Sequence, residues 1–335
     1  MLTAPLGSSS PGPKAEFPPV SICTPTFNRR PFLPYLIQCI QQQTYPLDKI
    51  EWVIVDDGTD PVADLVEPLT FVTVKYIRLE KKMPLGEKRN LMHTHCTGEI
   101  LVYMDDDDYY PPERVSHSVE KLLENPGILI AGSSIMHLYF KRLHKMYRFG
   151  PYGTHHATAA TFAFRKELLQ QTCYDSTKCV AEEKTFLKDY TIPMIQLDPM
   201  KTILVFSHIH NSVDKMDILN QGDLLQNPYI LESKVTPRDF IQDIVLYDFY
   251  VENIDSNLAG YVAGDPSHKP DVLLSLANNK VTMLERRLTT VSQELQKVQE
   301  EASRLREINR ILTDRLKSVI QGNLEKHRSD WKVSR

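Results

Sequence analysis

No stretch of this 335-residue sequence is apolar over the roughly 20 consecutive residues that a membrane-spanning helix needs. Residues 1–19 also lack the apolar core of a secretion signal and are rich in proline, serine and glycine, so we expect a disordered leader. The formal net charge of −4 is too small to suggest a general nucleic-acid-binding protein. These absences favour a cytoplasmic protein with neither a membrane span nor a nucleic-acid partner.

Cysteine is also scarce. The five cysteines are widely spaced, and no histidine or cysteine stands at the spacing of a zinc site. Scattered cysteines in odd number are typical of buried, reduced thiols in an intracellular protein. We therefore expect no structural zinc site in this chain.

Strand-like and helix-like segments alternate in the first third of the chain. The predicted strands are residues 20–24, 51–57, 73–79 and 99–104, and the predicted helices are residues 29–43 and 86–98. This order predicts an α/β fold, Rossmann-like, in which helices cover both faces of a mainly parallel sheet. Polar clusters follow three of the strands, as "TPTFNRR", "DDGTD" and "DDDD". Ligands of such sheets bind beyond the carboxyl ends of the strands, where these clusters lie.

The C-terminal part carries a heptad repeat of apolar residues from Leu274 onward. The a positions are Leu274, Val281, Leu288, Leu295, Ala302, Asn309 and Leu316, and the d positions are Ala277, Leu284, Val291, Val298, Leu305, Leu312 and Val319. A strict period of 3.5 over seven heptads predicts a coiled coil. Asn309 is the one polar a residue, which favours a parallel, two-stranded coil and hence a homodimer. The alternative is a single helix that folds back on the rest of the chain.

These patterns divide the chain into five parts. We expect a leader at 1–19, a catalytic domain at 20–215, a helical extension or linker at 216–270, a coiled coil at 271–321 and a disordered tail at 322–335.

Four adjacent carboxylates, Asp105 to Asp108, need either a counter-charge or open water. Their position at the end of a strand favours a bound divalent cation over a solvated loop. An EF-hand calcium loop is excluded because the segment has no glycine at the turn and is interrupted by Pro111 and Pro112. Alternate aspartates suit Mg²⁺ or Mn²⁺ that also holds a diphosphate.

Two blocks of the sequence carry a family resemblance. Residues 20–60 contain a strand ending in Pro-Thr-aromatic-Asn, a helix ending in Gln-Thr-Tyr-Pro, and a strand followed by Asp-Asp-Gly. Residues 86–115 contain Arg-Asn, Gly-Glu and an Asp-x-Asp signature before proline and an acidic–Arg pair. Together these motifs resemble family 2-type glycosyltransferases of the GT-A fold, and the resemblance covers about residues 20–212.

The resemblance implies a set of donor-binding residues. Asp105 and Asp107 would form the Asp-x-Asp, with Asp107 on the metal, Asp105 facing the metal or ribose, and Asp106 near the ribose and diphosphate. Asp56 and Asp57 would meet the nucleobase, since a carboxylate can accept from uracil N3–H. The other implied nucleotide-sugar residues are Pro25, Thr26, Phe27, Asn28, Arg29, Lys88 and Arg89. The alternative for Lys88 and Arg89 is solvated charge on a helix.

The segment "VAEEKTFL" resembles the acidic pair of the family at the start of a helix. The resemblance implies Glu183 as the general base, supported by Glu182, although the family more often has Asp at the second place. The alternative for each is a favourable acid at a helix N-terminus. His210 resembles a late histidine that completes the metal shell, with His208 as a structural residue. His155 and His156 are candidates for an acceptor loop.

The implied function is metal-dependent, inverting, hexosyltransferase-type transfer from a nucleotide sugar, expected to be UDP-linked, with Mn²⁺ or Mg²⁺. The acceptor would be a glycan, a protein or a small molecule. A sugar nucleotidyltransferase is a second hypothesis, but it would need a glycine-rich phosphate loop, and "TPTFNRR" has no glycine. A lectin-like pseudoenzyme scaffold is a third, against which the retained Asp-x-Asp, glutamate pair and histidine argue.

Overall fold

The computed structural model describes residues 17–212, 215–220 and 228–333. The chain divides into two units, residues 1–275 and 276–335, and each is described by itself. The predicted boundary at residue 215 does not divide the first unit, because the segment up to Ser275 belongs to it. Most of the predicted leader, residues 1–16, lies outside the described residues.

The first unit is built on a seven-stranded sheet with the strand order β3-β2-β1-β4-β8-β5-β9. The strands are β1 (Val20–Thr26), β2 (Ile50–Asp56), β3 (Thr73–Arg78), β4 (Ile100–Tyr103), β5 (Ile130–Gly132), β8 (Ala163–Arg165) and β9 (Met194–Gln196). The first four are parallel to their neighbours in this group, whereas β8 runs antiparallel to β4 and β5. The predicted α/β fold with a mainly parallel sheet is therefore confirmed.

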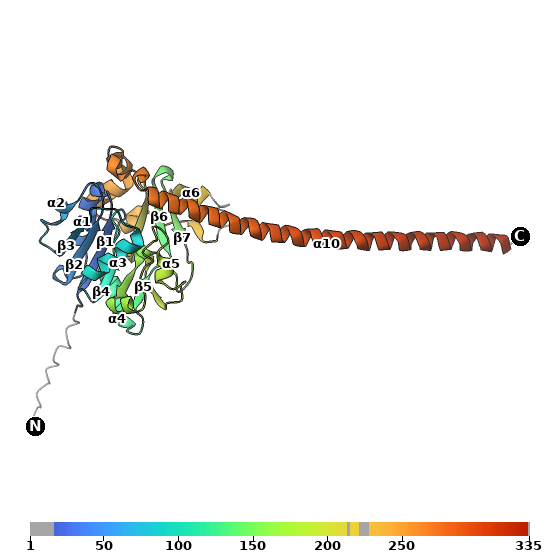
Figure 1. Ribbon diagram of the computed structural model, residues 1–335, viewed down its shortest axis with the longest axis horizontal. Helices are drawn as coiled ribbons and strands as arrows, with labels where there is room; N and C mark the ends of the chain where they lie inside the picture. The colour runs from blue at the N-terminus through green and yellow to red at the C-terminus, as the bar shows by residue number, and fades with distance from the viewer. Residues whose placement is uncertain (1–16, 213–214, 221–227, 334–335) are drawn as a thin grey trace, which may run out of the picture. The chain divides into compact units, whose positions relative to one another are not determined.

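Helices cover both faces of this sheet (Figure 1). They are α1 (Leu33–Gln41), α3 (Leu85–His95) and α4 (Arg114–Glu124). Trp52 and Ile54 of β2 share one core cluster with α1 and α4, whereas Val53 and Val55 share the other with α3. Successive side chains of a strand point to opposite faces, so α3 lies across the sheet from the other two helices. A strand covered on both faces is mostly apolar, which explains the apolar run from Trp52 to Val55 within β2.

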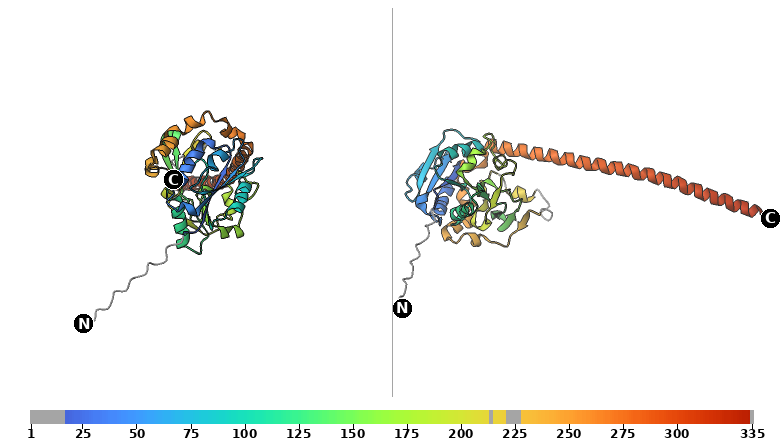
Figure 2. Two further views of the ribbon diagram at one scale, coloured as in Figure 1. Left: turned by 90° about the vertical axis from the view of Figure 1, so that its left-hand side faces the viewer. Right: turned by 90° about the horizontal axis from the view of Figure 1, so that it is seen from below.

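A second sheet has the order β10-β6-β7-β11. Its strands are β6 (Met136–Phe140), β7 (Lys145–Phe149), β10 (Leu204–Ser207) and β11 (Ile230–Glu232). The short helices of this unit are α2 (Ala63–Val66), α5 (Glu183–Phe186), α6 (Lys215–Asn220), α7 (Pro237–Phe240), α8 (Ile244–Tyr247) and α9 (Ile254–Leu258), with a π-helical turn at Asp248–Asn253. Figure 2 shows these pieces packed around the main sheet from two further sides.

The segment predicted as an extension or linker is instead part of the core where it is described. Its Ile241, Phe249, Tyr250 and Leu258 are buried in the same cluster as the sheet strands. The sequence did not reveal this because helices of four to six residues are too short to show a period.

The helix α10 runs from Pro270 to Val333, so one long helix spans the predicted coiled-coil segment and also most of the predicted tail. The tail from residue 322 was expected to be disordered, but a single Gly322 costs a helix only about 1 kcal/mol and good helix formers follow it. The apolar a and d residues are exposed in this single chain, as at Leu288 with 68%. Within the described parts of the chain, no helix is long and apolar enough to cross a membrane.

Candidate functional site

A cavity of about 390 Å³ lies beyond the carboxyl ends of β1 and β4. This volume is in the range of about 300–1,000 Å³ that small-molecule sites occupy. The sequence-predicted residues that line it are Pro25, Thr26, Phe27, Arg29, Lys88, Arg89, Asp105, Asp106, Asp107 and Glu182. The predicted residues that are absent from its lining are Asn28, Asp56, Asp57, Glu183 and His210.

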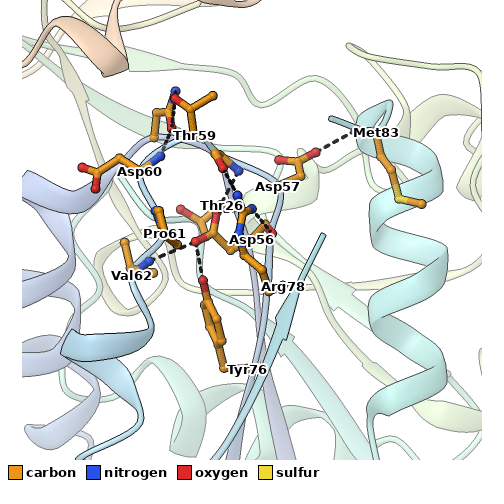
Figure 3. Close-up of polar contacts among 12 residues, drawn as sticks. Thr26, Asp56, Asp57, Thr59, Asp60, Pro61, Val62, Tyr76, Arg78 and Met83 are labelled. Atoms are coloured by element: carbon orange, nitrogen blue, oxygen red, sulfur yellow. Dashed lines mark hydrogen bonds and ion pairs between the residues drawn. The ribbon is translucent and has the colours of Figure 1, made fainter. Parts of the chain in front are cut away.

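The carboxylate of Asp56 is fully used by the loop that follows it (Figure 3). Its Oδ1 accepts from the N–H of Gly58 at 2.8 Å, and its Oδ2 accepts from the N–H of Val62 at 3.1 Å and the hydroxyl of Tyr76 at 2.7 Å. Asp56 is also 1% exposed. The geometry therefore does not support the predicted contact with a nucleobase, and gives Asp56 the role of holding its loop.

Asp57 acts on the pocket through other residues. Its carboxylate accepts from the N–H of Met83 at 2.7 Å (Figure 3) and forms an ion pair with Lys88. Burial lowers the pKa of the Lys88 ammonium, and the charge of Asp57 opposes that effect. Lys88 also donates to the carbonyl of Thr26 at 3.0 Å. Asp57 thus fixes two residues of the pocket wall.

Asn28 likewise joins two loops. Its φ of 53° is left-handed, a conformation that Asn adopts more readily than most residues. Its Oδ1 accepts from the N–H groups of Thr59 and Asp60, and its Nδ2 donates to the carbonyl of Ala263 at 2.8 Å. Asn28 therefore positions its neighbours at the pocket.

Each of the first three aspartates after β4 faces a buried cation. Arg89 lies 3.4 Å from Asp105, and Arg29 lies 3.6 Å from Asp106 and 3.3 Å from Asp107. Arg89 is 2% exposed and Lys88 only 5%, so the alternative of solvated helix charge is wrong for both. These contacts explain how like charges are tolerated at one strand end.

The four aspartates differ in their tendency to ionise. Burial, with a further effect of Asp107, raises the pKa of Asp106 to about 7, and burial raises that of Asp108 to about 8. Burial also acts against the ionised form of Asp107, but the contact with His208 and the charge of Arg29 outweigh it and hold its pKa well below the usual range. Asp107 is therefore the carboxylate that stays charged.

Of the two histidines after β10, His208 and not His210 lies beside the aspartates. His208 Nε2 lies 3.4 Å from Asp107 Oδ2, whereas the ring of His210 packs near Tyr261 and Gly264. The prediction assumed an extended strand through both, but β10 ends at Ser207 and the chain turns there. His208 Nδ1 accepts from the N–H of His210 at 3.2 Å, and its Nε2 also lies 2.8 Å from Asn211 Nδ2, so both ring nitrogens are engaged. Neither histidine lines the cavity, and the geometry gives His208 the role of holding Asp107.

No group of three or more His, Cys, Asp or Glu side chains converges as a ready-made ion site in the described residues. The carboxylate of Asp107 nevertheless fits a cation that takes its other ligands from substrate and water. Burial lowers the pKa of His208 to about 4, despite the opposing contact with Asp107, so its imidazole is neutral. Because Nδ1 accepts from the N–H of His210, the ring proton lies on Nε2, which faces Asp107.

The predicted acidic pair lies at the start of α5. Glu182 Oε1 accepts from Arg89 Nε at 3.0 Å at the cavity wall. Burial and the charge of Glu182 raise the pKa of Glu183 to about 7. A carboxylate whose pKa lies near neutral pH suits a general base. Glu182 is instead held in an ion pair by Arg89.

Three lysines that the sequence did not single out also line the cavity. Lys82 forms an ion pair with Asp271. Lys215 donates to the carbonyl of Phe206 at 2.8 Å, and Lys269 lies 3.2 Å from the hydroxyl of Ser212. Among the described residues, no carboxylate lies within ion-pair distance of Lys215 or Lys269. The residues beyond 212 show no motif that could have revealed Lys215 and Lys269.

The family model "Glycosyl transferase family 2" matches residues 21–179. An uncharacterized glycosyltransferase of Haemophilus influenzae is 31% identical over 109 residues, which are 32% of this chain and 36% of that protein. The poly(ribitol-phosphate) beta-N-acetylglucosaminyltransferase TarS of Staphylococcus aureus is 30% identical over 96 residues, 28% of this chain and 17% of TarS. The chain spans between 17% and 48% of the length of the curated relatives it matches.

Solved structures give looser likenesses. TarS residues 1–349 with UDP-GlcNAc has a TM-score of 0.42 and 18% identity, covering 56% of this chain and 58% of that one. The mannosyltransferase PcManGT of Pyrobaculum calidifontis, with GDP-Man and Mn²⁺, has a TM-score of 0.47 and 16% identity, covering 80% and 76%. At these scores the likenesses carry no weight for substrate or mechanism.

Proposed function

We propose, from the premise that residues 21–179 form a family 2-like glycosyltransferase domain, that the protein moves a hexosyl group from a UDP-sugar to an acceptor hydroxyl with inversion. The observation that carries this proposal is the cavity beyond β1 and β4, which is lined by Asp107 and by two lysines, Lys215 and Lys269, that have no carboxylate within ion-pair distance among the described residues. A charged carboxylate beside such cations suits a metal-bound diphosphate.

The donor would be held by the chain's own groups in two places. Lys215 and Lys269 bind the diphosphate, because their ammonium groups reach the cavity without a competing carboxylate among the described residues. The nucleobase packs on Phe27 and the neighbouring backbone of Pro25 and Thr26, since Asp56 is already bonded to its own loop.

Asp105 and Asp107, which both line the cavity, would hold a Mn²⁺ or Mg²⁺ ion, with His208 positioning Asp107. Such an ion, when bound, supplies positive charge that stabilises the departing nucleoside diphosphate. Arg29 then keeps Asp106 and Asp107 in place.

Glu183 accepts the proton of the acceptor hydroxyl. The acceptor oxygen forms a bond to the anomeric carbon as the bond to the diphosphate breaks, and the nucleoside diphosphate leaves with the bonding electrons. The pKa of Glu183, raised by burial to about 7, suits this proton transfer near neutral pH. Glu182 remains paired with Arg89 and holds the start of α5.

We also propose that α10 forms a parallel, two-stranded coiled coil that makes the protein a homodimer. The exposed a and d residues along this helix support the proposal, because an isolated helix would leave this apolar stripe in water.

The test is turnover of a panel of UDP-sugars with Mn²⁺ by the purified protein. Asp107→Ala should lose turnover, and Asp314→Ala, which removes an exposed aspartate from α10, is the matched control. Full turnover in Asp107→Ala would remove the metal role. Tight UDP binding without turnover on any acceptor would favour the pseudoenzyme scaffold.

A further inference from the structure

Four rings form a continuous row outside the donor cavity. The ring centroids of Tyr229 and Tyr152 are 5.4 Å apart, those of Tyr152 and His156 are 4.9 Å apart, and those of His156 and Tyr190 are 4.7 Å apart. Tyr152 is 43% exposed and Tyr229 is 46% exposed, so one end of the row faces solvent. None of the four residues lines the donor cavity. The row is therefore a separate aromatic surface, built from three segments of the chain.

The backbone around these rings is held in place. The N–H of Gly150 donates to the carbonyl of Tyr229 at 2.8 Å, which ties the segment before β11 to the loop after β7. Gln196 Nε2 donates to the carbonyls of Thr154 at 2.8 Å and His156 at 3.1 Å. Because these bonds fix the loop that carries Tyr152 and His156, their rings are arranged before any ligand binds.

The other end of the row lies near the candidate base. Lys188, Asp189 and Tyr190 have φ angles of 49°, 56° and 62°, a left-handed run that residues with side chains rarely adopt. Such backbone outliers are concentrated at functional sites. Tyr190 follows α5, whose first residue is Glu183, by four positions. Burial raises the pKa of Tyr190, and the charge of Glu183 raises it further.

We propose that the row from Tyr229 through Tyr152 and His156 to Tyr190 binds the acceptor, and that this acceptor is a carbohydrate chain. The inference rests on the proposed function and selects one of its three acceptor classes. A sugar ring presents a C–H face that packs on an aromatic ring, while its hydroxyls at the edge stay in water or bond to tyrosine hydroxyls. A row of half-exposed rings suits a chain of several linked sugars. The sugar bound at the Tyr190 end would present its hydroxyl to Glu183.

The experiment measures retention of the full-length protein on immobilised hexasaccharides of glucose, galactose, mannose, xylose and N-acetylglucosamine. Wild type should bind at least one of them. Tyr152→Ala and Tyr229→Ala should each weaken that binding about tenfold, as expected for the loss of one stacked ring. Tyr152→Phe should restore it, because the ring and not the hydroxyl makes the contact. Tyr247→Ala, which removes a ring stacked on Arg238 outside the row, is the matched control.

Titration with UDP runs in parallel and separates this inference from the proposed function. If UDP binds normally but no hexasaccharide retains the protein, the proposed carbohydrate site at the row is wrong while the proposed function stands. The same conclusion follows if UDP binds normally and Tyr152→Ala is retained as strongly as wild type. Binding of an immobilised proline-rich peptide in place of every hexasaccharide also overturns it. Hexasaccharide binding that depends on the rings, without any UDP binding or turnover, supports the carbohydrate site at the row and counts against the proposed transferase function.

Discussion

Two strand ends carry acids that look alike in the sequence but do different work. After β2, Asp56 is bonded to two backbone N–H groups and one hydroxyl of its own neighbourhood. After β4, Asp105, Asp106 and Asp107 face the cavity and arginine side chains. Asp56 is 1% exposed, whereas the side chains of Asp105 and Asp107 are 24% and 19% exposed. Their partners differ as well, because the arginine that pairs with Asp56, Arg78, lies 3.9 Å away and its side chain is 35% exposed.

A carboxylate that accepts from neutral N–H groups organises a loop, and its bonds have no reason to change during a reaction. A carboxylate that faces a cavity beside an arginine keeps a charge that a ligand can exploit. We therefore expect the first strand end to matter for the stability of the fold and the second to matter for the proposed reaction. Four variants test this division.

The largest effect is expected for Asp107→Ala. Transfer from the UDP-sugar should fall at least about 100-fold, since one group that stabilises the developing charge is commonly worth that much. The thermal unfolding midpoint should hardly move, because no backbone group loses its partner. Steady-state kinetics and a melting curve on the same sample measure both. A large loss of stability would mean that Asp107, like Asp56, mainly stabilises the fold.

Asp56→Ala should show the opposite pattern. The change leaves the N–H groups of Gly58 and Val62 and the hydroxyl of Tyr76 without their acceptor, which we expect to cost about 3 kcal/mol of unfolding free energy. Urea denaturation measures this loss. UDP affinity, expressed per folded molecule, should change little. A loss of affinity larger than the unfolded fraction explains would support the predicted contact of Asp56 with the nucleobase.

The acid pair at α5 extends the comparison to pH. With its pKa raised by burial to about 7, Glu183 is protonated below that pH and cannot accept a proton. The turnover number should therefore rise about tenfold per pH unit below 7 and level off above it. Asp106 also titrates near 7, so the profile is repeated with Asp106→Asn. Persistence of the acidic limb assigns it to Glu183, and its disappearance assigns it to Asp106.

The smallest effect is expected for Lys269→Met. Removal of one diphosphate contact should weaken UDP binding about five- to tenfold, as for a partly exposed charge pair. Isothermal titration gives the Kd, with Lys317→Met on the exposed part of α10 as the control. Equal affinity in the two variants would remove Lys269 from the donor site.

The sequence predicted the scaffold better than the detailed roles. The alternation of strands and helices was enough for the sheet, and the Asp-x-Asp fell at the cavity because strand ends meet there. The contact of His208 with Asp107 depended on one turn after β10, which no periodicity reveals. Lys269 and the three tyrosines of the aromatic row were missed for a similar reason, since they lie on segments far apart in the chain, whereas His156 was among the predicted acceptor-loop residues.

The lining of the donor cavity includes Lys269 and Val272, at the first turn of α10. The family match ends at residue 179, about ninety positions earlier. The matched segment therefore does not contain all the residues that line the cavity. Shortening the chain at residue 212, where the sequence resemblance fades, would take away one wall of the cavity along with the helix. A minimal version of this unit has to be cut after Ser275.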